Sequence, residues 1–369
     1  MASSTPLQPA MKRARLSAND DDVHHGGRND NLLVFTMFRL DDVDRTDVAL
    51  VDASTGAVVR HVDRMATPLG SHVCADGGLL CVVSARHGML RLVDAATGGV
   101  ADLSPVATTA KGNVHSGYTL GQVPATGEYK VLHVYAVRSC DLNPYEQSTE
   151  VVTVDGDGGW RQTRSPPMRV EYMVKRGSAI VGGVAYFLPA VEHGTEGVDG
   201  DSIAAFDLAA ERWHPTLLQG PLKQQGHRCR VSGRLHLALA ALDGRLVTVH
   251  HNYPANSMDL WSLSTETGND TTVRWTKTHS IPLDAILLGR EGCRSSSTSP
   301  MMAMQVVPNH RECLGQPLMI LDDGRIVVLA MGKTGGVRVY DPRMGLYKEV
   351  AQLGQCGYHV GFYNRSLVD

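Results

Sequence analysis

Short hydrophobic runs alternate with small polar turns along almost the whole chain, starting at Leu32. Each run has roughly five to eight residues and is rich in Val, Leu, Ile and aromatic side chains, as is typical of β-strands. Clear examples are Leu79–Val83, Tyr129–Tyr135, Leu235–Leu239 and Arg325–Leu329. No segment longer than about ten residues keeps the 3.6-residue period of a helix. The pattern therefore predicts an all-β protein.

The turns between these runs carry the residues that tight hairpins need. Asp76-Gly77, Asp243-Gly244 and Asp323-Gly324 each lie between two hydrophobic runs. An Asp-Gly pair favours a two-residue hairpin turn, because glycine accepts the positive φ that such turns require. Glycine accounts for 38 of the 369 residues, which is above the average usage of roughly 7%. We interpret this excess as hairpin turns rather than as flexible linkers.

A longer repeat is superimposed on the strands. The segment Ala49–Gly56 is echoed by Arg91–Gly98, so that Asp94 follows Asp52 by 42 residues. The same unit, a strand with an Asp turn and then a strand that bears an aromatic residue, occurs four more times. These later units centre on Asp155, Asp207, Asp259 and Asp341. A unit of this length corresponds to one four-stranded blade.

Short antiparallel sheets have unpaired strand edges, and a closed ring of sheets protects them. We therefore predict a β-propeller of about six, or alternatively seven, four-stranded blades over residues 32–369. The run Leu32–Phe38 precedes the first repeat. We expect it to complete the last blade, so that N- and C-terminal strands close the ring. An array of β-sandwiches is the alternative architecture.

Composition narrows the class of protein. The formal net charge is −3, and a protein that grips nucleic acid needs a concentrated positive field. Residues 1–31 are polar and have no hydrophobic period, so we expect a disordered tail and no secretory leader. No apolar run reaches the roughly 18 residues of a membrane span. We predict a cytoplasmic and/or nuclear protein that binds neither nucleic acid nor membranes.

The seven cysteines are scattered along the chain without any C-x-x-C pair. This spacing is typical of reduced thiols and not of a zinc or redox site. Histidine is frequent, but His250 and His251 would point to opposite faces of a strand. His133 and His236 have no nearby second ligand on their own strands. We expect no metal site, no cofactor and no catalytic residues, so the chain is not predicted to be an enzyme.

Aromatic residues recur at one position of the repeat. They are Trp160, Trp213, Trp261, Trp275 and Tyr340. A recurring position in a repeated unit indicates packing between blades rather than a ligand cage.

Binding residues of a propeller lie on its loops, because the blades are occupied with packing. Aromatic and Arg side chains supply most of the energy of protein interfaces. Three loop residues meet these conditions: Tyr145, Tyr253 and Arg294. We predict that they contact a protein partner and that the chain itself is a monomer.

Residues 45–350 resemble the plant F-box-associated domain, a kelch-like β-propeller found in F-box proteins. The order of several motifs carries the resemblance, since each motif alone is weak. The motifs are the turn in Leu90–Gly98, the strand Tyr129-Lys130-Val131, Glu150–Val154 with Trp160-Arg161, Ile180–Leu188 with Ile203–Leu208, and Leu242–Leu246 with Met258–Trp261 and Trp275-Thr276-Lys277.

The resemblance implies a substrate-recognition module of a cullin-type ubiquitin ligase that binds without catalysis. Residues 1–31 contain no F-box, so a Skp1-type adaptor is expected as a partner only where an F-box lies upstream. Two alternatives stay open: a lectin-like propeller that binds glycans, and an enzyme that resembles galactose oxidase.

Overall fold

A computed structural model shows how the predicted strands assemble. The described residues are 32–38, 45–66, 72–76, 79–83, 90–94, 100–103, 114–137, 146–154, 156, 159–172, 177–190, 199–224, 236–266, 272–283, 315–330, 336–352 and 358–363. They divide into a smaller unit, from Met1–Asp52, Ala57–Ala110 and Tyr358–Asp369, and a larger unit, from Ala53–Gly56 and Lys111–Gly357. The predicted tail, residues 1–31, lies outside the described residues.

The described residues of the smaller unit form eight strands. They are β1 Leu32–Phe38, β2 Arg45–Asp52, β3 Val58–Ala66, β4 His72–Asp76, β5 Leu79–Val83, β6 Leu90–Asp94, β7 Val100–Leu103 and β24 Tyr358–Tyr363. The strands form two four-stranded sheets with the orders β24-β1-β2-β3 and β4-β5-β6-β7, and all pairs are antiparallel.

The two ends of the chain meet in the first of these sheets. β1 pairs with β24 in an antiparallel register that runs from Leu32 opposite Tyr363 to Met37 opposite Tyr358. On its other edge β1 pairs with β2. The prediction that Leu32–Phe38 joins a C-terminal strand is therefore confirmed.

In the larger unit, the part of the chain that the structure describes forms sixteen strands in four sheets. The first two sheets, β11-β10-β9-β8 and β12-β13-β14-β15, use β8 Val114–Gln122, β9 Tyr129–Val137, β10 Gln147–Thr153, β11 Arg161–Thr163, β12 Ser178–Val181, β13 Val184–Phe187, β14 Ala204–Asp207 and β15 Arg212–Trp213. The next two, β16-β17-β18-β19 and β20-β21-β22-β23, use β16 Leu237–Leu242, β17 Arg245–Asn252, β18 Ser257–Glu266, β19 Thr272–Pro282, β20 Gly315–Ile320, β21 Ile326–Ala330, β22 Gly336–Asp341 and β23 Leu346–Gln352. A single turn of helix, α2 Pro221–Gln224, precedes β16.

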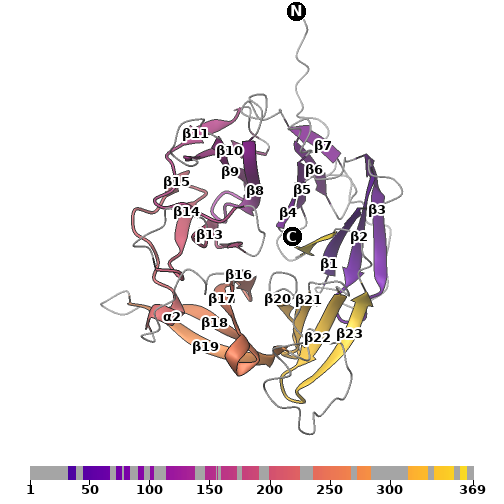
Figure 1. The fold of residues 1–369 in the computed structure, drawn as a ribbon. Helices are drawn as coiled ribbons and strands as arrows, with labels where there is room; N and C mark the ends of the chain where they lie inside the picture. The colour runs from indigo at the N-terminus through magenta and orange to yellow at the C-terminus, as the bar shows by residue number, and fades with distance from the viewer. Residues whose placement is uncertain are drawn as a thin grey trace, which may run out of the picture. The chain divides into compact units, whose positions relative to one another are not determined.

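In every sheet of the larger unit the strands follow one another in chain order (Figure 1). The first strands of neighbouring sheets are in contact, since β12 contacts β16 and β16 contacts β20. In the smaller unit the edge strand β24 contacts β4 in the same way. Successive four-stranded antiparallel sheets that meet along their first strands are the arrangement of a β-propeller. The all-β, propeller-type fold class is thus the one that the sequence predicts.

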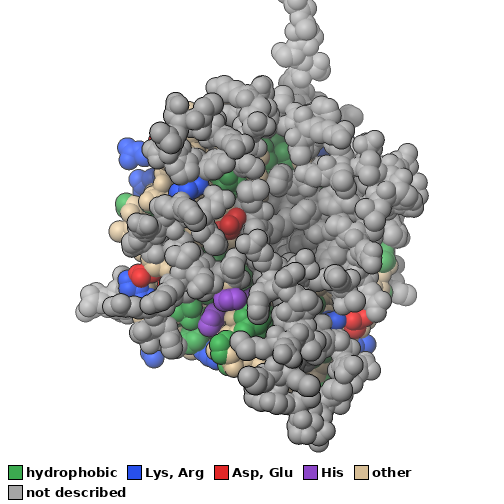
Figure 2. Space-filling view, in the orientation of Figure 1, with side chains coloured by type: hydrophobic (Ala, Val, Ile, Leu, Met, Phe, Trp, Pro, Cys, Tyr) green, Lys and Arg blue, Asp and Glu red, His purple; other side chains and the backbone are tan. Residues whose placement is uncertain are grey.

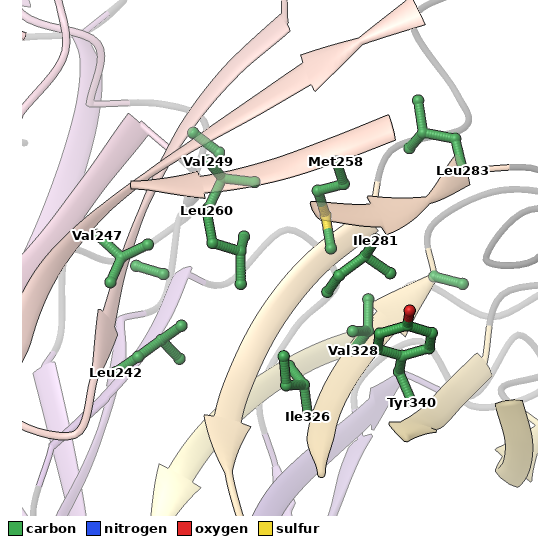
Figure 3. Packing of buried hydrophobic residues seen from close by; sticks show 13 residues of the cluster. Leu242, Val247, Val249, Met258, Leu260, Ile281, Leu283, Ile326, Val328 and Tyr340 are labelled. Carbon is green, nitrogen blue, oxygen red and sulfur yellow. The ribbon is translucent and has the colours of Figure 1, made fainter. Parts of the chain in front are cut away.

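Apolar side chains fill the space between adjacent sheets. Figure 3 shows Met258, Leu260 and Ile281 of one sheet facing Ile326 and Val328 of the next. Each of these five side chains is fully buried. Side chains alternate between the two faces along a strand. One face of a sheet therefore packs against the preceding sheet and the other face against the following sheet.

The repeat and its turns have structural counterparts. The segments that centre on Asp52, Asp94, Asp207, Asp259 and Asp341 belong to β2, β6, β14, β18 and β22, each the third strand of its sheet. In the remaining unit Val152 and Thr153 end β10, and Asp155 lies outside the described residues. At the predicted turn, Leu242 pairs with Arg245. Asp243 has a φ of 50° and Gly244 a φ of 67°. Two positive φ values define the hairpin turn that the Asp-Gly pair predicts.

Candidate binding site at the Tyr253 turn

Tyr253 lies on a short, well-fixed turn at one end of a sheet. The turn is the 3-10 helix η4 Tyr253–Ala255, between β17 and β18. The side chain of Asn252 accepts a hydrogen bond from the backbone of Ala255 at 3.3 Å. At the other end, the backbone N–H of Asn256 donates to the carbonyl oxygen of Tyr253 at 3.0 Å. Both ends of the turn are therefore capped.

The same turn presents its next residues to solvent while it anchors the tyrosine ring. Pro254, Ala255 and Asn256 are exposed, and Tyr253 is half-buried. The tyrosine ring packs against the apolar cluster between the third and fourth sheets of the larger unit. Its position is thus fixed by packing before any partner binds.

Two histidine rings lie next to the Tyr253 ring. The His236 ring meets the Tyr253 ring edge-on, with centroids 4.8 Å apart. The His251 ring lies 6.4 Å away at an interplanar angle of 25°. Histidine side chains reach the surface beside hydrophobic ones over β16 and β17 (Figure 2). Because Tyr253 is only half-buried, the accessible part of its ring can stack on an apolar or aromatic side chain of a partner.

His251 connects the starts of two neighbouring sheets. Its Nδ1 lies 3.1 Å from the carbonyl oxygen of His236, and its Nε2 lies 2.8 Å from that of Gly315. Gly315 begins β20, and His236 directly precedes β16. A carbonyl oxygen only accepts, so a neutral ring can serve one of these contacts and a protonated ring both. The buried His251 side chain therefore links the backbone at His236 to that at Gly315, next to the Tyr253 ring.

The other predicted site residues fall in different places. Tyr145 and Arg294 lie outside the described residues. Trp213, Trp261, Trp275 and Tyr340 are buried and belong to the apolar clusters between sheets. Trp160 is half-buried, and its ring meets that of His133 at a centroid distance of 5.9 Å.

A buried His–Glu pair escaped the sequence reasoning. His133 on β9 is fully buried, and its Nδ1 donates to Glu150 Oε1 on β10 at 2.8 Å. The ring of Tyr118 on β8 stacks on the imidazole at 4.3 Å. Burial lowers the pKa of His133, and the hydrogen bond to Glu150 opposes this shift only in part. The signal was available in principle, because Glu150 lies directly opposite His133 once the two strands are paired.

A second polar cluster connects the first two sheets of the larger unit. Glu211 accepts hydrogen bonds from Lys130 Nζ at 2.8 Å and from Arg161 Nε at 3.0 Å. Arg161 Nη2 donates a further bond to the same carboxylate at 2.6 Å and one to Thr153 at 2.8 Å. Lys130 is 7% exposed, so this carboxylate neutralises a lysine that burial would otherwise destabilise.

This cluster gives a pH prediction. The hydrogen bond from Arg161, followed by that from Lys130, lowers the pKa of Glu211 against the opposing effect of burial. A lowered carboxyl pKa adds stability above the pKa of the unfolded state, about 4.3, and loses it as the pH falls through the folded value. Glu211→Gln should therefore destabilise the protein at pH 7 and approach wild type in acid, as measured by urea unfolding across pH. Glu146→Gln, at an exposed carboxylate beside β10, is the control; an equal loss in both variants at every pH would contradict the prediction.

The described residues contain neither a metal-binding cluster nor a membrane-spanning helix. No group of three or more His, Cys, Asp or Glu side chains in the described ranges is placed to hold a metal ion. No helix among those residues has the length and apolar character to cross a membrane.

Comparisons with known proteins show no sequence relative. No protein-family model matches the chain, and no curated protein matches it. Among solved structures, a puromycin hydrolase complexed with PGG is similar with a TM-score of 0.44 and 14% identity, over 89% of this chain and 47% of that one. A chain of a nidogen–laminin complex is similar with a TM-score of 0.43 and 8% identity, over 89% of this chain and 97% of that one. A functionally unknown protein from Desulfotomaculum acetoxidans is similar with a TM-score of 0.40 and 12% identity, over 87% of this chain and 80% of that one.

Proposed function

We propose that this chain is a protein-recognition scaffold that binds its partner at the Tyr253 turn and makes or breaks no covalent bond. The observation that carries the proposal is the pre-formed turn itself. Tyr253 is held by two caps and by packing, next to three exposed residues. A rigid aromatic residue loses little conformational entropy on binding, which is why such residues dominate interface energies.

The finer proposal concerns the assembly and the partner class. The six sheets would be the blades of one ring, and the ring would act as the substrate-binding half of an F-box-type adaptor. One repeated segment per sheet and the resemblance to the F-box-associated domain support this proposal. A Skp1-type adaptor would then join through an F-box located upstream, and a monomeric chain would work in the cytoplasm, the nucleus or both.

The test compares partner capture by the wild-type chain and by variants of the turn. Tyr253→Ala removes the aromatic ring, and Ala255→Arg places a bulky charge on the exposed part of the same turn. Each should weaken binding of a specific partner by roughly thirtyfold or more in Kd, which corresponds to about 2 kcal/mol. Quantitative mass spectrometry after capture identifies candidates, and calorimetry with the purified partner measures the Kd.

Two variants provide the controls. Tyr253→Phe keeps the ring and should bind nearly as the wild type does. Met344→Arg changes a residue that is 67% exposed on another turn of the larger unit, and it should have no effect. A partner that all variants retain equally would exclude the Tyr253 turn as the binding site. A glycan that binds in a Tyr253-dependent way would favour the lectin alternative, and roughly stoichiometric Skp1 would support the ligase.

A further inference from the structure

Arg338 is a buried cation on an apolar face. It lies on β22, opposite Val328 of β21, and residues opposite each other in adjacent strands share a face of the sheet. Val328 belongs to the apolar cluster between the last two sheets of the larger unit. The Arg338 side chain is only 3% exposed.

The hydrogen-bond donors of this guanidinium are poorly satisfied. The charged partner is Glu349, whose Oε2 lies 3.5 Å from Arg338 Nη2. A good ion pair of this type has a separation of about 2.7–2.9 Å. The Nε and Nη1 atoms are both buried, and neither has a hydrogen-bond partner among the described residues. Two buried nitrogens of a permanently charged group, which together carry three N–H donors, are thus unsatisfied.

Glu349 is poorly placed to compensate for this charge. Its side chain is 34% exposed, and water screens a carboxylate that is partly solvated. The pairing of β22 and β23 shifts register between Val337 and Arg338. Such a bulge re-aims a side chain relative to its cross-strand neighbour. Arg338 and Glu349 are paired directly after this bulge, and Arg338 Nη2 lies 3.5 Å from Glu349 Oε2.

A buried cation whose counter-ion is distant and partly solvated is destabilised, because its lost hydration is not replaced. A neutral water could accept from one N–H group, but it would leave the charge uncompensated. The missing component is therefore an acceptor that is also negative. Arginine binds such anions well, because the N–H groups of the planar guanidinium fit the spacing of the oxygens in carboxylates and phosphates.

From these contacts we propose that Arg338 is the centre of an anion-binding site for a small oxyanion, of the carboxylate or phosphate class. The oxyanion accepts hydrogen bonds from Nη1 or Nε and balances the charge that Glu349 balances only in part. The site uses the Arg338 guanidinium on β22 and no residue of the turn between β17 and β18, so Tyr253→Ala should bind the anion as the wild type does. An experiment that disproves the anion site therefore leaves the proposed binding function of the Tyr253 turn untouched, and the reverse also holds.

The experiment measures binding of inorganic phosphate and, separately, of acetate to the full chain at constant ionic strength. Calorimetry should detect one saturable anion per chain, and Tm should rise to a plateau with anion concentration. Arg338→Met should abolish both effects, and Arg338→Lys, which keeps the charge, should weaken binding at least tenfold. Arg343→Met is the matched control, since Arg343 is an exposed arginine of the same sheet.

The outcomes separate a site from a general salt effect. Phosphate also stabilises proteins by exclusion from their surface, but that rise does not saturate and would be the same in all variants. A saturable effect that only the Arg338 variants lose supports the site, and the tighter of the two anions identifies the ligand class. Absence of saturable binding of either anion to the wild type, or equal binding by wild type and Arg338→Lys or Arg338→Met, would overturn the proposal. If Arg338→Met does not fold, the anion affinity of Arg338→Lys relative to the wild type decides whether the site exists.

Discussion

Replacing Trp213 by alanine is expected to lower the free energy of unfolding by about 3–5 kcal/mol. Trp213 lies on the short outer strand β15, where it is 8% exposed. Its ring contacts Phe206 at 5.2 Å and Phe187 at 5.5 Å between centroids. Truncation to alanine removes these contacts and opens a cavity that surrounding side chains fill only in part. Equilibrium unfolding in urea or guanidinium measures the loss.

The indole also connects two sheets, which allows a graded control. Trp213 Nε1 donates to the hydroxyl of Thr149 on β10 at 3.3 Å. Trp213→Phe keeps an aromatic ring but loses this bond, so it should cost clearly less than the alanine variant. Leu346→Ala, at a leucine that is 52% exposed, should change stability by no more than about 0.5 kcal/mol. A Trp213→Ala variant that is as stable as Leu346→Ala would show that the ring is not part of the core.

The local parts of this fold were predictable from sequence because they depend on neighbouring residues. The run Leu79–Val83 is the strand β5, and Leu32–Phe38 is β1, both with the predicted bounds. The hairpin at Asp243-Gly244 forms because only two residues have to adopt a positive φ. Predicted bounds shift where a run meets a polar end. For example, β21 covers Ile326–Ala330, whereas the predicted run starts at the polar Arg325.

The polar clusters were not predictable because their partners are distant in sequence. Lys130 meets Glu211 across 81 residues, and Arg161 meets the same carboxylate across 50. A pattern of hydrophobic and polar positions assigns a residue to a face of a strand, but it does not fix which sheet packs on that face. The position of Tyr253 on a turn between two strands was predictable because the signal is local, whereas its role in binding stays a prediction.

Glycines on inner strands carry information of the same long-range kind. Gly117 lies on β8. A Cβ atom at Gly117 would lie 2.2 Å from the carbonyl oxygen of Tyr172 and 2.9 Å from its carbon. These are backbone atoms, so no side chain can rotate away to make room. The sequence shows a glycine here, but only the packed structure shows that the glycine is required by a neighbour 55 positions along the chain.

The segment around Tyr172 cannot yield easily. The side-chain amide of Gln147 holds Val170 through two hydrogen bonds, at 2.9 and 2.8 Å. The backbone of Glu171 donates to the carbonyl oxygen of Leu188 at 2.8 Å. Moving Tyr172 away from β8 would strain or break these bonds. The clash at Gly117 must therefore be relieved by distortion of both segments.

Gly117→Ala is accordingly expected to destabilise the protein by about 3 kcal/mol, at the upper end of the usual cost of overpacking. The matched control is Gly159→Ala. Gly159 does not have a positive φ, and a Cβ there would have no atom within 4 Å. At such a site alanine stabilises by about 0.4–1 kcal/mol, because it reduces the conformational entropy of the unfolded chain. Thermal and urea unfolding of both variants should thus give opposite signs. A Gly117→Ala variant as stable as Gly159→Ala would mean that β8 and the Tyr172 segment do not approach this closely in solution.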